Sequence, residues 1–90
     1  MRHYKHFNTT PEATEQCELA LRDDGNFVWL ISRSEADGGA VSHDARGHWT
    51  QSGDTITFEI AVRSSEEAPV PITATVVGDR LEIAGFGTFA

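Results

Sequence analysis

The stretch TITFEIAVR, residues 55–63, carries the clearest structural signal in the chain. Every second residue from Ile56 to Val62 is apolar, and the residues between them are Thr, Glu and Ala. This period of two is typical of a β-strand that buries one face. The tripeptide Ser-Gly-Asp at 52–54 supplies the backbone freedom that a tight reversal needs. The stretch therefore predicts a hairpin in which residues 48–51 pair with this strand.

Two further hairpins follow the same pattern, in which alternating strand residues are separated by a short turn rich in Gly and Asp. Their arms and turns are residues 72–77, 78–79 and 80–84 for one, and 17–22, 23–26 and 27–33 for the other. Three hairpins in 90 residues predict one all-β domain over residues 1–90, an antiparallel meander of six to eight short strands.

Three segments lack this alternation. Residues 10–16, TPEATEQ, favour a short helical turn, because Thr10 can cap a helix and Pro11 suits its first position. The alternative is one longer helix over residues 11–22. We expect residues 34–44 to form a mobile glycine-containing loop. Residues 64–71 are expected to be a polar loop whose two prolines block further strand pairing.

The composition excludes several classes of protein. The net charge is −7, which argues against nucleic acid and anionic membranes as partners. The single cysteine, Cys17, excludes an internal disulfide framework, and its alternation with Leu19 and Leu21 predicts a small buried residue. No apolar run reaches the length of a signal peptide or membrane span. We therefore expect a cytoplasmic protein without a leader.

Four pieces of sequence carry a resemblance to a known group. They are LALRDDGNF (19–27), GHWTQSGDTITF (47–58), GDRLEI (78–83) and GFGTF (85–89). Together they resemble the lipocalin-like (calycin) group, in particular bacterial lipocalin-like domains of the copper-resistance lipoprotein type. This resemblance implies a small β-barrel, and members of such families commonly bind small apolar molecules or act as extracytoplasmic sensors. Because the chain is shorter than a cavity-bearing lipocalin, we expect a small, filled or partial barrel.

The histidines are the main candidates for a metal or catalytic site. His43, Asp44 and His48 are close in sequence and provide metal ligands, or a base with its orienting carboxylate. The fixed spacing of known zinc motifs is absent, so surface residues are the preferred interpretation. His3 and His6 are three apart and would point to opposite faces of a strand. No cofactor is predicted.

The apolar side chains support a binding or interaction role more than catalysis. The candidates for a ligand-binding site or an interface are Phe27, Trp29, Leu30, Trp49, Phe58, Arg63, Phe86 and Phe89. They would equally serve a filled core. Residues 27–31, FVWLI, are apolar on both faces, which a strand with one buried face does not need. We therefore predict a non-enzymatic binding or interaction domain that forms a twofold homodimer, with a small apolar molecule as its candidate ligand. The alternative is a metal-binding protein or small enzyme using the cluster of His43, Asp44 and His48.

Overall fold

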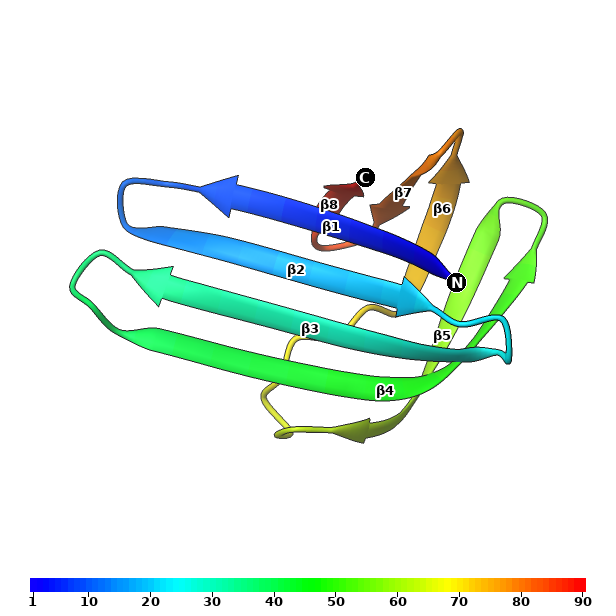
Figure 1. Cartoon of the computed structure of the whole chain (residues 1–90), viewed down its shortest axis with the longest axis horizontal. Helices are drawn as coiled ribbons and strands as arrows, with labels where there is room; N and C mark the ends of the chain where they lie inside the picture. The colour runs from blue at the N-terminus through cyan, green and yellow to red at the C-terminus, as the bar shows by residue number, and fades with distance from the viewer.

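A computed structural model describes residues 1–90 as eight strands with no helix. The strands are β1 (Arg2–Thr9), β2 (Ala13–Leu21), β3 (Asn26–Glu35), β4 (Ala40–Ser52), β5 (Thr55–Arg63), β6 (Thr73–Val77), β7 (Arg80–Ile83) and β8 (Gly87–Phe89). Each strand pairs antiparallel with the next, so the order across the sheet is the order in the chain (Figure 1). This confirms the all-β meander and all three predicted hairpins.

The sheet curls until its two ends meet. The Lys5 N–H donates to the Ala90 carbonyl at 2.8 Å, and the Ala90 N–H donates back to the Lys5 carbonyl at 3.0 Å. Beside this pair, the His6 Nδ1 lies 2.8 Å from the Thr88 carbonyl oxygen, and the His6 ring stacks on Phe89 at 5.1 Å between centroids. These contacts join β1 to the C-terminal residues and make a nearly closed barrel. Closure protects the first and last strands of the meander, whose unpaired edges would otherwise favour aggregation.

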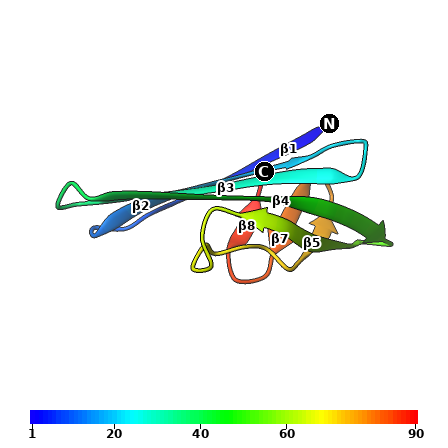
Figure 2. The ribbon, with the colours of Figure 1, turned by 90° about the horizontal axis from the view of Figure 1, so that it is seen from below.

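The barrel has unequal halves. Strands β1 to β4 have 8 to 13 residues, whereas β6, β7 and β8 have 5, 4 and 3. Figure 2 shows the four long strands as one layer that projects well beyond the short strands packed beneath it. The projecting end, called the wing below, consists of residues 7–15 and 33–41. No neighbouring strand pairs with its outer edges, since the backbone pairing of β1 with the C-terminal residues is at Lys5 and Ala90, and β5 pairs with β4 only from Ala45 onward.

Inward-facing side chains from both halves fill the barrel. Pairing places Leu19 opposite Trp29 and Cys17 opposite Ile31, so that one face of each strand is buried as the alternation predicts. The core residues are Tyr4, Cys17, Leu19, Leu21, Phe27, Trp29, Ile31, Ala45, Ile56, Phe58, Ala74, Leu81, Ile83 and Phe89. The barrel is therefore small and filled.

Strands β4 and β5 approach each other closely at Gly47, where β4 bends from one half of the barrel into the other. The pairing of β4 with β5 shifts register between Arg46 and Gly47. A Cβ atom on Gly47 would lie 1.9 Å from the Glu59 carbonyl oxygen. Only glycine fits this position, because any other residue would collide with the backbone of β5.

Two predictions about local structure are wrong. Residues 10–16 do not form a helical turn: residues 10–12 form the β1–β2 turn, and β2 begins at Ala13. Pro11 and the capping hydroxyl of Thr10 serve this turn instead, with the Thr10 N–H donating to the Ala13 carbonyl at 2.8 Å. Residues 34–44 are also no mobile loop, since β3 and β4 run through most of them and the Glu35 N–H closes a tight turn on the Gly39 carbonyl at 2.6 Å.

The loop at residues 64–71 is confirmed as an irregular segment between β5 and β6. It crosses one end of the barrel, where the Trp29 indole N–H donates to the Pro69 carbonyl at 2.8 Å. The loop thus covers the core at the end from which the wing projects.

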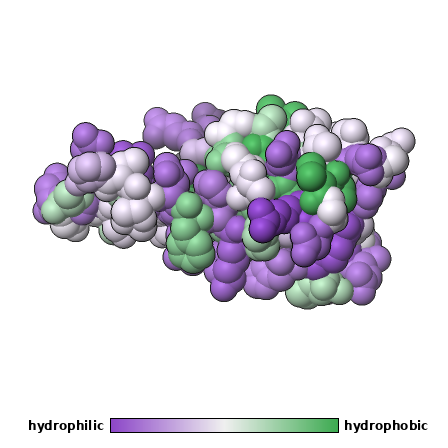
Figure 3. Space-filling view, turned by 90° about the horizontal axis from the view of Figure 1, so that it is seen from above, coloured by the Kyte–Doolittle hydropathy of each residue, from purple (hydrophilic) through white to green (hydrophobic).

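Apolar and polar residues are unevenly distributed over the surface. In Figure 3 most apolar atoms gather over the barrel half, whereas the projecting end is largely polar. The structure contains no helix long and apolar enough to cross a membrane.

Candidate functional site

Four of the predicted binding residues belong to the core. Phe27, Trp29, Phe58 and Phe89 are almost completely buried, with Trp29 at 0% exposure. Phe27 meets Phe58 edge-on at 5.1 Å between ring centroids, and Trp29 lies 5.7 Å from Phe89. Their rings contact one another and leave no space for a ligand between them. These four side chains therefore stabilise the core of the barrel.

Phe86 and Trp49 are half-buried and lie against the core. Phe86 packs edge-on against Trp29 at 4.9 Å between centroids. Trp49 lies near the β2–β3 turn, where its indole N–H donates to the Arg22 carbonyl at 3.0 Å. The Arg2 guanidinium lies over the Trp49 ring at 5.1 Å, a cation–π contact that joins the first strand to β4.

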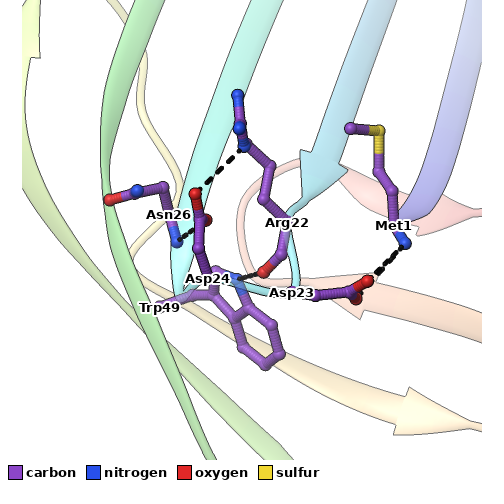
Figure 4. A network of polar contacts seen from close by, with 6 residues as sticks. All are labelled: Met1, Arg22, Asp23, Asp24, Asn26 and Trp49. Atoms are coloured by element: carbon purple, nitrogen blue, oxygen red, sulfur yellow. Dashed lines mark hydrogen bonds and ion pairs between the residues drawn. The ribbon is translucent and has the colours of Figure 1, made fainter.

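Polar contacts around the β2–β3 turn hold the end of the barrel opposite the loop at residues 64–71 (Figure 4). The Asn26 N–H donates to Asp24 at 3.0 Å, and Arg22 lies 3.4 Å from the same carboxylate. These groups lower the pKa of Asp24, the backbone hydrogen bond from Asn26 being the main cause. The Met1 ammonium pairs with Asp23 at 3.2 Å. The turn is thus tied to the N-terminus and to Trp49, and it presents no free set of ligands.

The histidine cluster is not assembled. His43 lies opposite Ile31, on the inward side of β4, whereas Asp44 lies opposite Leu30, on the outward side. His48 is also outward, beyond the bend at Gly47. No three His, Cys, Asp or Glu side chains lie close enough together to hold a metal ion. Likewise His3 and His6 occupy opposite faces of β1, as their spacing predicts.

A groove of about 300 Å³ opens where the wing meets the barrel, beneath the loop at residues 64–71. It is lined by Glu15, Ile31, Arg33, Val41, His43, Glu67 and Pro69. Arg33 is paired with Glu35 at 2.9 Å, so its charge is already compensated. The volume is at the lower limit for sites that hold small molecules.

The sequence patterns do not predict most of the residues that line this groove. Glu15 lies on the same inward face of β2 as Cys17. A charged residue among inward-facing residues is the sequence signal that could have identified Glu15 as part of a site. The expected helical turn over residues 10–16 hides this signal, because a helix would place Glu15 and Cys17 on different faces. Glu67 lies in a loop, and its place over the groove depends on the tertiary fold.

Cys17 lies behind the groove and is buried, as predicted. Burial, with a smaller contribution from the negative charge of Glu15, raises the pKa of the thiol to about 12. The thiol is therefore protonated at neutral pH, and since the thiolate is the nucleophile, Cys17 is unreactive in the folded protein.

The outward side of β1 to β4 is a second notable surface, and it looks toward the viewer in Figure 1. On β3, Val28 and Leu30 are 39% and 37% exposed, while their neighbours Phe27 and Trp29 face inward. Leu30 is the one predicted interface residue that lies here. Arg63 is also exposed, at the end of β5, where it borders a shallow hollow with Asp44 and Arg46.

Comparison with known proteins finds no matching family model, no similar curated sequence and no similar solved structure. The function is therefore inferred from the structure of the chain itself.

Proposed function

We propose that this chain is a non-enzymatic interaction domain on a small lipocalin-like barrel, and that it binds through the outside of the barrel. One observation carries the proposal: the two faces of β3 are both apolar, but only one is covered. Phe27, Trp29 and Ile31 are buried in the core, while Val28 and Leu30 remain exposed with no element packed over them. Exposed apolar side chains on a sheet are typical of contact surfaces.

The filled interior supports this mode of binding over the internal cavity that is usual among lipocalin-like proteins. A ligand inside would have to displace the rings of Trp29 and Phe89, which contact each other. Removing a large core side chain from its packing costs about 3 to 5 kcal/mol, and a domain of this size has little stability to spare. The groove beneath the loop at residues 64–71 opens at the surface of the barrel instead.

A small ligand with an apolar part is a second candidate, favoured by the groove beneath the loop at residues 64–71. Ile31, Val41 and Pro69 provide its apolar lining. Such a ligand would occupy the mouth of the barrel and leave the core intact.

Native mass spectrometry and an NMR titration with decanoate, an apolar chain bearing one carboxylate, test the proposal. We expect the chain to be released without a bound small molecule, and any saturable chemical shift changes to be confined to surface residues. A stoichiometric apolar molecule retained after purification, or saturable shifts of the Trp29 indole N–H together with the Phe89 ring, would contradict it. Val41→Glu should abolish binding at the groove, whereas Val77→Glu, on β6, should not.

A further inference from the structure

We infer that the outward side of β1 to β4 binds a second copy of this chain, giving a twofold dimer in which the two sheets pack face to face. This inference deepens the proposed function, on which it rests, by naming the partner. The surface, called the outer face below, is defined by the outward residues of the paired strands. Its apolar residues near the centre are Ala20, Val28 and Leu30, and its charged residues are Lys5, Glu18, Asp44 and Arg46.

The centre of the outer face is apolar. Val28 and Leu30 are two residues apart on β3, and Ala20 lies directly across from Val28 on β2. Phe7, 61% exposed, lies on the same side of the sheet at the base of the wing. An apolar centre within a polar border is the usual arrangement of a protein interface.

Its charges are balanced, unlike those of the rest of the chain. Lys5 and Arg46 offset Glu18 and Asp44, whereas the whole chain carries −7. Two copies can therefore bring their outer faces together without the repulsion that other acidic surfaces would produce. Lys5 and Glu18 already pair at 3.6 Å, but Asp44 and Arg46 have no ion-pair partner within the chain.

The two unpaired charges favour one arrangement of the dimer. Leu30 and Asp44 form one row across the sheet, and Val28 and Arg46 form the next. A twofold axis parallel to these rows and midway between them places Leu30 over Val28 of the second copy, and Asp44 over Arg46 of the second copy. Each contact occurs twice, because a twofold interface is self-complementary. This arrangement joins Leu30 to Val28 and Asp44 to Arg46, and it places Glu18, which is already paired with Lys5, over Ala20 of the second copy.

A hollow in the outer face fits the same arrangement. It has a volume of about 360 Å³ and is lined by Arg22, Asn26, Phe27, Val28, Asp44, Arg46 and Gly47. In the arrangement above, Leu30 of the second copy lies over Val28, at the border of this hollow.

The area of the outer face is sufficient for a reversible dimer. Four strands about 4.8 Å apart and about 27 Å long present roughly 500 Å² of sheet per copy. Two copies would bury about 1,000 Å², which is at the low end for specific interfaces. The free edges of the wing offer less, because each is short: residues 6–9 of β1 and residues 40–43 of β4.

Sedimentation velocity of the full chain from 1 to 200 µM tests the inference. We expect a concentration-dependent dimer, and a Kd at least about tenfold weaker in Leu30→Glu, since a buried carboxylate without a partner is costly. Val77→Glu is the matched control, because Val77 is another exposed strand valine, on β6, outside the outer face. It should leave the Kd unchanged, and circular dichroism should show that both variants fold.

Charge exchange tests the arrangement. Asp44→Arg and Arg46→Asp should each weaken the dimer, and the double variant should restore it, because the pair is formed in the reverse sense. A dimer that the double variant does not restore would overturn the pairing of these rows. A parent protein that is monomeric at 200 µM, or a dimer unaffected by Leu30→Glu, would overturn the inference while leaving the filled interior, and with it the proposed function, intact. Conversely, a ligand found inside the barrel would overturn the proposed function whatever the oligomeric state.

Discussion

The substitution Gly47→Ala should destabilise the protein far more than the removal of a glycine usually does. The added Cβ would lie 1.9 Å from the Glu59 carbonyl oxygen and 3.0 Å from the Ala61 nitrogen, both backbone atoms of β5. Backbone atoms cannot rotate away as a side chain can, so β4 and β5 must separate by more than an ångström. Overpacking of this kind costs about 3 kcal/mol or more.

Gly53→Ala is the matched control. Gly53 is in the β4–β5 turn with φ of 61°, and a Cβ there meets no atom within 4 Å. Its replacement should cost only about 1 kcal/mol, from the left-handed backbone conformation. A comparison of the two variants therefore separates collision from backbone strain on the same pair of strands.

Urea denaturation followed by tryptophan fluorescence, at one fixed protein concentration, measures both effects. With a slope of about 1 kcal/mol per molar urea for a small domain, the midpoint should fall by about 3 M for Gly47→Ala and about 1 M for Gly53→Ala. If the parent midpoint is below 3 M, the Gly47 variant should be unfolded in water by circular dichroism. A Gly47→Ala variant as stable as the Gly53→Ala variant would refute the close approach of β4 to β5.

Three further predictions concern the barrel. Burial raises the pKa of the Cys17 thiol from 9.0 to about 12, so between these pH values the folded protein keeps a proton that the unfolded chain loses. The free energy of unfolding should therefore fall between pH 9 and 12. Urea titrations should show a smaller decline in the Cys17→Ala variant. His6→Ala should lower the free energy of unfolding by about 1 to 2 kcal/mol and speed amide exchange at Ala90, and unchanged exchange would argue against its role at the junction of β1 and β8. Trp29→Phe removes the hydrogen bond to the loop at residues 64–71, so limited proteolysis should cut that loop faster than in the parent, and equal rates would contradict the tether.

The sequence by itself determined the hairpins and the inward faces of their strands. Alternation at residues 55–63 and the short turns at Gly53 and Gly78 are local signals, since a β-strand repeats every two residues and a tight turn needs particular backbone angles. For the same reason Cys17 could be assigned to the core without a structure. These inferences need no knowledge of which strands lie side by side.

Only the tertiary structure decided what surrounds each face. Residues 10–16 and 34–44 have weak patterns, and most of them become strand because pairing with a neighbour supplies their backbone hydrogen bonds. The same pairing sends His43 to one face and Asp44 to the other, which separates the cluster that proximity in sequence had suggested. Alternation along β3 shows two apolar faces, but the packing of the short strands beneath β1 to β4 encloses one of them and leaves Val28 and Leu30 outside (Figure 2).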